Sequence, residues 1–339
     1  MCPFMDYTVG MDTELVTIEP SETIPARIEA GITPALFAGS RQRETRFWEF
    51  FAATIRNKNT RQAYLHAVFR FSDWCMANNI ELDDVEPMVV SAYVEQLTQI
   101  YAAPTVKQHL AAIRMLFDWL VVGQMVAMNP ASAVRGPKHV VKTGKTPILT
   151  ATEARELLDA IDTSNLVGLR DRAIIGTMVY SFGRVSAVAA MNVADYYTQG
   201  KRSFFRLHEK GGKYNVVPAH HLAQEYLDAY ITAANIGDDR KGPLFRSSGP
   251  GRQCDRLDRK AMSRHTVIKM VKRRALQVGL PGEICNHSFR GTGITEYLRN
   301  GGELEKAARI AGHESTRTTQ LYNRTDDELT LDEIERIHI

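Results

Sequence analysis

The sequence predicts a mainly α-helical protein with one small β-sheet, organised in two domains. Its 339 residues suffice for about two domains of ordinary size. Apolar residues recur at steps of three and four between residues 43 and 120, which is the period of amphipathic helices. Later in the chain, two short strand-like runs flank Gly211-Gly212, which is a hairpin signal. With 44% apolar and 24% charged residues, the composition excludes a collagen-like, coiled-coil or wholly disordered chain.

The first 40 residues differ from the rest of the chain. They show no sustained periodicity, contain four prolines, and carry six acidic residues against one basic residue. We therefore expect residues 1–40 to form a flexible acidic leader. The formal net charge of the whole chain is only +3, so the remainder is more basic than that total suggests. A basic globular part permits nucleic acid as a partner without proving it.

The pattern of residues 41–134 predicts a small bundle of four amphipathic helices. Asn59 or Thr60 can cap the second helix, and Pro87 and Pro104 suit the first turns of the third and fourth. The expected helices are residues 43–56, a segment from 59 or 60 that includes 64–75, residues 87–100, and a segment from 104 to 120. The bundle ends near Asn129, because the following proline disfavours continued helix.

Residues 135–148 predict a basic linker between the domains. They contain four Lys or Arg residues, no acidic residue, and Gly and Pro at intervals. The charge could simply keep the segment solvated, or it could place the linker along a phosphate backbone.

Residues 149–339 predict a second domain that mixes helices with a hairpin. Thr150 and Glu153 have the spacing of a helix-capping box. The expected elements are helices at 150–162 and 169–182, strands at 203–208 and 214–217, further helices from Ser263 onward, and a tail from about 326.

The cysteines and the N-terminus bear on the compartment. The four cysteines are scattered and form no CxxC pair, which favours a reducing environment over a disulfide framework or a zinc site. The acidic N-terminus does not resemble a signal peptide, and no apolar run is long enough to span a bilayer. We therefore expect a cytoplasmic protein without a membrane partner.

Five short motifs could carry chemistry. In chain order they are Arg184 after the buried helix, Lys210 beside the glycine pair, His287 with Arg290, His313 after a glycine, and Tyr322. Residues three apart share a helix face, so His287 and Arg290 would point at one spot. Each motif is weak alone, because a His–Arg pair is usually a solvated face and a lone Tyr usually packs in a core.

The combination resembles the tyrosine site-specific recombinase (phage integrase) family, which includes Cre and the Xer recombinases. The resemblance covers residues 43–325 and is carried by the order and spacing of the five motifs. It implies a SAM-like core-binding domain at the N-terminus and an α+β catalytic domain. It also implies double-stranded DNA as substrate and four protomers on two DNA sites.

The resemblance implies an enzyme that cuts and rejoins DNA through a covalent 3′-phosphotyrosine and a Holliday junction. Tyr322 would be the nucleophile, and Arg184 and Arg290 would stabilise the charged transition state. Lys210 would be the general acid, with Lys213 as its competitor. His287 would take or orient the tyrosine proton, and His313 would bind the phosphate or support the site. The bond energy is kept in the covalent link, so neither ATP nor a metal ion nor any other cofactor is needed.

Two positions depart from the family pattern. The family usually has an acidic residue three positions after the first arginine, and here that position is Ala187. The residue before the arginine is Gly183 instead of the usual Leu. The usual carboxylate helps to fix the site, so its absence puts the local support of Arg184 in question.

Basic residues on both domains are candidates for DNA contacts. Residues 251–274 contain nine basic and two acidic residues, and Ser263 can cap a helix that the family inserts in the major groove. The candidates are Lys58, Arg61, Arg70, Lys107, Arg114, Lys138, Lys142, Lys213, Arg264, Lys269, Lys272 and Arg273. For each of them ordinary solubility is the alternative interpretation.

The C-terminal tail contains five Leu or Ile residues between 329 and 339. We expect these apolar side chains to be buried against another protein surface. Docking on the same protomer is one possibility, and the resemblance implies docking on a neighbour in the tetramer. Two rival functions also stay open. One is a non-catalytic DNA-binding relative, and the other is a type IB topoisomerase or telomere resolvase that uses the same chemistry.

Overall fold

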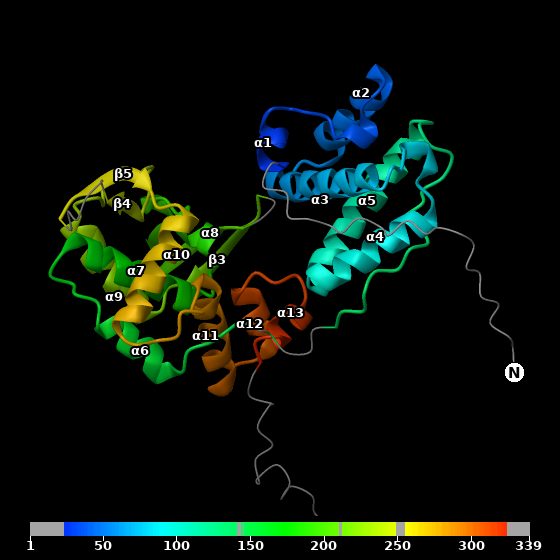
Figure 1. Cartoon of the computed structure of the whole chain (residues 1–339). Helices are drawn as coiled ribbons and strands as arrows, with labels where there is room; N and C mark the ends of the chain where they lie inside the picture. The colour runs from blue at the N-terminus through cyan, green and yellow to red at the C-terminus, as the bar shows by residue number, and fades with distance from the viewer. Residues whose placement is uncertain (1–23, 141–143, 145, 210–211, 249–254, 324–339) are drawn as a thin grey trace, which may run out of the picture. The chain divides into compact units, whose positions relative to one another are not determined.

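The computed structural model describes residues 24–140, 144, 146–209, 212–248 and 255–323 (Figure 1). The chain divides into two compact units, one up to residue 140 and one from residue 141, so the proposed linker 135–148 straddles their boundary. Residues 1–23 of the expected leader, Lys142, Lys210 and the tail from 326 lie outside the described residues. None of the helices in the described ranges has the length and apolar character to cross a membrane.

The first unit is a helical bundle, as predicted. Its elements are α1 (Ile24–Glu29), η1 (Ala35–Phe37), α2 (Arg41–Glu49), the π-helical turn η2 (Phe50–Thr54), α3 (Lys58–Ala77), η3 (Leu82–Asp84), α4 (Pro87–Ile100) and α5 (Ala103–Val122). The three longest correspond to predicted helices. The α3 cap is Asn57 instead of Asn59 or Thr60, and its side-chain oxygen accepts hydrogen bonds from the backbone N–H groups of those two residues.

The expected leader is shorter than 40 residues. Ile24 and Phe37 are fully buried in the core of the first unit, together with Phe47 from α2. Arg27 binds both carboxylate oxygens of Asp73 on α3, at 2.8 and 2.9 Å. The sequence analysis missed this packing because α1 and η1 are six and three residues long, too short to show a helical period.

The second unit carries the sheets and a second set of helices. Its elements are α6 (Ala151–Asp159), α7 (Leu166–Ser181), α8 (Val185–Ala189), η4 (Val193–Asp195), β1 (Tyr196–Gln199), β2 (Arg202–His208), β3 (Tyr214–Pro218), α9 (His221–Ala233), β4 (Arg246–Ser248), β5 (Leu257–Ala261), α10 (Arg264–Gln277), α11 (Asn286–Arg299), α12 (Leu304–Ile310) and α13 (Thr316–Gln320). The capping box predicted from Thr150 and Glu153 is present on α6.

The sheets are antiparallel and small. In the larger one the order is β1-β2-β3, and Phe205 on the central strand pairs with Tyr196 on one side and Val217 on the other. The β2–β3 hairpin is the predicted one, whereas β1 and the β4–β5 pair were not predicted. The β5 sequence Leu-Asp-Arg-Lys-Ala is mostly exposed and lacks the apolar alternation by which strands are recognised.

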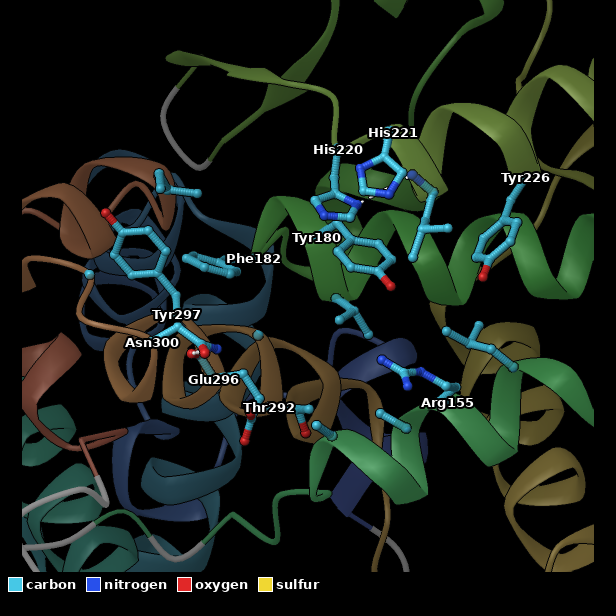
Figure 2. A pocket seen from close by; sticks show the side chains of 18 of the residues that line it. Arg155, Tyr180, Phe182, His220, His221, Tyr226, Thr292, Glu296, Tyr297 and Asn300 are labelled. Carbon is cyan, nitrogen blue, oxygen red and sulfur yellow. Dashed lines mark hydrogen bonds between the residues drawn. The ribbon is translucent and has the colours of Figure 1, made fainter.

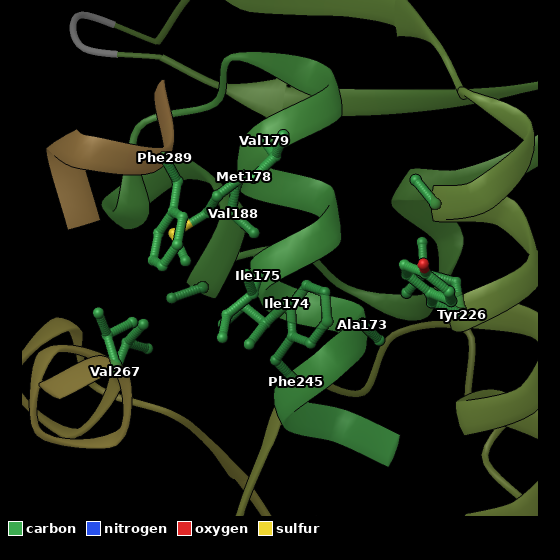
Figure 3. Packing of buried hydrophobic residues seen from close by; sticks show 14 of the residues in the cluster. Ala173, Ile174, Ile175, Met178, Val179, Val188, Tyr226, Phe245, Val267 and Phe289 are labelled. Atoms are coloured by element: carbon green, nitrogen blue, oxygen red, sulfur yellow. The ribbon is translucent and has the colours of Figure 1, made fainter. Parts of the chain in front are cut away.

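The core of the second unit surrounds α7 (Figure 3). Ile174 and Met178 of α7 are fully buried, and Phe289 of α11 and Val267 of α10 pack in the same cluster. On the side facing α9, a Cβ at Gly176 would lie 2.8 Å from the ring of Tyr226, so α7 and α9 meet closely there. No residue of α7 is exposed, and its Arg170 and Asp171 are buried together with its apolar side chains. This packing fixes α7 and the residues that follow it.

Candidate active site

The C-terminal end of α7 positions the first arginine. The helix ends at Phe182, whose left-handed backbone (φ 53°, ψ 24°) is costly for a residue with a side chain. Its ring is buried beside Ile294 and Ala311, which offsets that cost. Arg184 then caps α8 and pairs with the carboxylate of Glu209 at the end of β2. The Arg184 side chain keeps 36% of its surface exposed, so it can reach a ligand.

The second arginine, Arg290 on α11, is 2% exposed. Its guanidinium donates to the carbonyl oxygens of Phe182 and Ala311, the second at 2.7 Å. Burial, followed by the charge of Arg184, lowers the Arg290 pKa to about 10. Arg290 therefore stays charged at neutral pH, and the carbonyl oxygens satisfy part of a charge that would otherwise be costly to bury.

The ring of His313 connects Arg290 to the last helix. Its Nε2 lies 2.5 Å from Nη2 of Arg290, and its Nδ1 lies 2.8 Å from the hydroxyl of Thr319 on α13. Burial and the charges of Arg290 and Arg184 lower the His313 pKa to about 4, so the ring is neutral at neutral pH. Both ring nitrogens are engaged by protein groups.

Tyr322 follows α13 and is half-buried. Its ring is nearly parallel to that of His313, with centroids 6.1 Å apart, and its carbonyl accepts a hydrogen bond of 2.8 Å from Thr295. Gly291 gives the ring room, since a Cβ there would lie 3.3 Å from Cδ1 of Tyr322. Tyr322 is among the groups that oppose the lowering of the Arg290 pKa, so the phenol lies within electrostatic reach of the guanidinium.

His287 lies one turn before Arg290 on α11. Partial burial, followed by the charges of Arg290 and Arg184, lowers the His287 pKa. A neutral imidazole in this position can accept a proton.

The structure thus brings together Arg184, His287, Arg290, His313 and Tyr322, while Lys210 lies outside the described residues. Lys213 is largely exposed and pairs with Glu314 at 3.2 Å. Sequence reasoning missed Glu209 and Thr319. Only the position of Glu209 beside Lys210 could have drawn attention to it.

On α10 the DNA-contact candidates Arg264, Lys269 and Lys272 are exposed, and the predicted cap is present, since Ser263 accepts a hydrogen bond from the Thr266 N–H. The Arg273 side chain is partly exposed and forms an ion pair with Asp171 at 3.1 Å.

In the first unit, three of the candidates are less exposed than the sequence analysis assumed. Arg70 is 7% exposed and lies over the Tyr101 ring. The guanidinium of Arg114 donates to the carbonyls of Ala131 and Val134, and that of Arg61 donates to the carbonyl of Ile55. These contacts join segments distant in sequence or close a turn, which a helical pattern does not reveal. Exposed candidates in this unit are Lys58, Lys107 and Lys138.

Comparison with known families decides the identity of the fold. Residues 147–328 match the model of the phage integrase family, and residues 46–125 match the phage integrase N-terminal SAM-like domain. The chain belongs to the phage integrase family. The protein is a tyrosine recombinase, an enzyme that transfers DNA strands in site-specific recombination. The mainly helical fold, with a SAM-like unit and an integrase catalytic unit, is as predicted.

Named relatives and solved structures agree with this assignment. Tyrosine recombinase XerC of Chlamydia muridarum is 29% identical over 240 residues, covering 70% of this chain and 71% of that protein. XerC of Thermodesulfovibrio yellowstonii is 28% identical and covers 80% and 87%. The fold is similar to that of XerH bound to difH (TM-score 0.61, 16% identity, 94% and 97% covered). It is also similar to a lambda integrase dimer bound to a COC′ core site (TM-score 0.62, 18% identity, 85% and 97% covered).

Proposed function

We propose that Tyr322 is the nucleophile of this recombinase and that Arg184 and Arg290 bind the scissile phosphate. The observation that supports this most is the convergence of Arg290, His313 and Tyr322. His313 contacts the Arg290 guanidinium and stacks on the Tyr322 ring, so the phenol could attack a phosphate held by that guanidinium. Two permanent positive charges would stabilise the negative charge on the non-bridging oxygens.

The proton transfers follow from this assignment. Oη of Tyr322 forms a bond to phosphorus, the bond from phosphorus to the 5′-oxygen breaks, and the leaving oxygen takes a proton from Lys210. His287, which its lowered pKa keeps unprotonated at neutral pH, accepts the phenolic proton. A 5′-hydroxyl of the partner strand reverses these steps. Because both nitrogens of His313 are engaged, we assign it to the support of Arg290 instead of phosphate binding.

The exposed basic residues form the proposed DNA contacts. Arg264, Lys269 and Lys272 on α10 would enter a groove of the duplex, with Arg273 contributing the part of its side chain that is free of Asp171. The first unit would bind backbone phosphates through Lys58, Lys107 and Lys138. The second unit would do the same through Lys142 and Lys213. The basic linker 135–148 would follow the backbone.

We further propose that four protomers act on two DNA sites and that the C-terminal tail of each docks on a neighbour. The second unit has a cavity of about 850 Å³ that supports this proposal (Figure 2). Apolar and aromatic side chains line much of it, among them Leu158, Tyr180, Phe182, Leu222 and Tyr297. The tail supplies apolar side chains of matching character, namely Leu329, Leu331, Ile334, Ile337 and Ile339.

We also propose that the protein acts in the cytoplasm. This proposal is based on the four scattered cysteines, which favour a reducing compartment.

Replacing Tyr322 with Phe tests the central assignment. The change removes the nucleophilic oxygen and keeps the ring beside His313 and Gly291. The probe is a nicked duplex containing the sequence that the wild-type protein selects from a random DNA library. We expect no covalent protein–DNA adduct and unchanged binding in a gel shift. Adduct formation by Tyr322→Phe at the wild-type rate would overturn the assignment.

A further inference from the structure

Glu209 forms an ion pair that the family pattern does not predict. It follows β2, and its backbone N–H closes the hairpin by donating to the carbonyl of Lys213 at 2.8 Å. One carboxylate oxygen accepts from Nη1 of Arg184, and the side chain is only 10% exposed. Within the described ranges no other carboxylate forms an ion pair with Arg184.

The position that usually supplies a carboxylate does not supply one here. Ala187 is 2% exposed and belongs to the apolar core of the second unit. The methyl group can neither pair with a guanidinium nor accept a hydrogen bond. Any acidic support for Arg184 therefore has to come from another segment, and Glu209, directly after β2, provides it.

The Glu209 carboxylate also acts on the second arginine. It is among the charges that oppose the lowering of the Arg290 pKa, whereas Arg184 contributes to that lowering. Two guanidinium groups that converge on one phosphate repel each other while the phosphate is absent. A single carboxylate in reach of both offsets that repulsion and holds them for the substrate.

The second oxygen of Glu209 is not satisfied by the described part of the protein. This Oε1 is buried and has no hydrogen-bond partner in the described structure. It lies 3.6 Å from the point where a Cβ on Gly312 would stand, so the carboxylate borders the glycine that precedes His313. An unsatisfied buried oxygen costs free energy, and such groups persist where function requires them.

We propose that Glu209 is a positioning residue that fixes the Arg184 guanidinium for the scissile phosphate, replacing the carboxylate absent from position 187. The proposal rests on the assignment of Arg184 to the phosphate. Glu209 touches no DNA in this scheme and acts only through the arginines.

The test compares Glu209→Ala and Glu209→Gln in the full-length protein, with the nicked library-selected duplex as probe. We expect Glu209→Ala to slow single-turnover adduct formation about 100-fold, by analogy with the loss of one transition-state donor. Glu209→Gln keeps the shape and should slow it about tenfold. DNA affinity should stay within about twofold of wild type for both. Glu314→Ala, which removes an exposed acid paired with Lys213, is the matched control and should react normally.

A double-mutant cycle separates positioning from a general loss of structure. In an Arg184→Ala background, Glu209→Ala should cause no further slowing. A full additional 100-fold loss in that background, or a wild-type rate for Glu209→Ala alone, would overturn the proposal. If Tyr322→Phe is inactive while Glu209→Ala is fully active, only this inference fails. If Tyr322→Phe still forms adducts, the proposed function fails with it.

Discussion

Nη2 of Arg290 lies 2.5 Å from Nε2 of His313, and the opposite ring nitrogen lies 2.8 Å from the Thr319 hydroxyl. A guanidinium only donates hydrogen bonds, so Nε2 must be the unprotonated acceptor. The proton then resides on Nδ1 and is donated to Thr319. The neutral ring is a fixed bridge between a buried charge and the helix that precedes Tyr322. Protonation of Nε2 would break that bridge.

The His313 bridge makes stability dependent on pH. The His313 pKa is about 4 in the folded protein, below the ordinary value of 6.5. The unfolded chain therefore binds the proton more readily, and the stabilisation is complete above pH 6.5 and is lost as the pH falls to about 4. We expect the free energy of unfolding in urea to decrease across that window.

His313→Gln serves as the control for this titration. The amide can still accept from Arg290 but does not titrate, so the decrease should be smaller in the variant. His109 in the first unit, whose pKa burial also lowers to about 4, should account for part of what is left. An identical pH dependence in wild type and His313→Gln would contradict the prediction.

Asp171 should be essential to the stability of the second unit. It is fully buried on α7 and accepts hydrogen bonds from Arg170, Arg273 and Arg274, the last two from α10. Asp171→Asn leaves these arginines without their counter-charge. We expect the free energy of unfolding to fall by about 3–5 kcal/mol, as measured by urea denaturation.

Arg273→Ala is the matched variant at the same cluster. Its side chain is 55% exposed, so the ion pair should contribute only about 0–1 kcal/mol. Equal destabilisation by Arg273→Ala and Asp171→Asn would show that the buried carboxylate is not the centre of the cluster.

Substitutions at two basic residues of α5 should distinguish a side chain that stabilises the first unit from one that binds DNA. The Arg114 guanidinium is bound to two backbone carbonyls, whereas Lys107 is exposed. Arg114→Ala should lower the stability of the first unit by about 1–3 kcal/mol and leave DNA affinity nearly unchanged. Lys107→Ala should do the reverse and reduce the slope of log affinity against log salt by about 0.9. Thermal melts and binding to the library-selected duplex at several salt concentrations measure both effects. The assignment fails if Lys107→Ala leaves the salt slope unaltered.

Deleting residues 329–339 tests the docking of the tail on a neighbour. The deletion should leave binding to one site nearly intact and weaken assembly on two sites. Each buried Leu or Ile contributes on the order of 1.5–3 kcal/mol before ordering costs, and this free energy would appear only on assembly. Sedimentation with and without DNA and thermal melts of the monomer provide the readouts. A destabilised monomer that still assembles normally would place the tail on its own protomer.

Local patterns in the sequence predicted most of the fold. The helix periods of α3 and α5, the proline at the start of α4, the Thr150 cap and the β2–β3 hairpin are signals contained within a few turns of chain. The order of the five motifs also predicted the proximity of Arg290, His313 and Tyr322, whereas Lys210 lies outside the described residues. The burial of Arg70 and the pairing of Arg184 with Glu209 were beyond such reasoning, because both depend on which elements pack together. From the sequence alone, a charged residue on a helix is expected to face solvent, because the residues that pack against it are not yet known.

The tight enclosure of α7 has a consequence for the motions of the enzyme. An amide hydrogen of a helix covered on all sides meets solvent only when the surrounding core opens. In deuterium exchange, α7 should therefore be among the last segments of its unit to take up label. Arg184, which we propose to bind the scissile phosphate, follows that helix by three residues and therefore borders a slowly opening part of its unit. We therefore expect the rearrangements of strand exchange to involve the segments after Arg184 more than α7 itself.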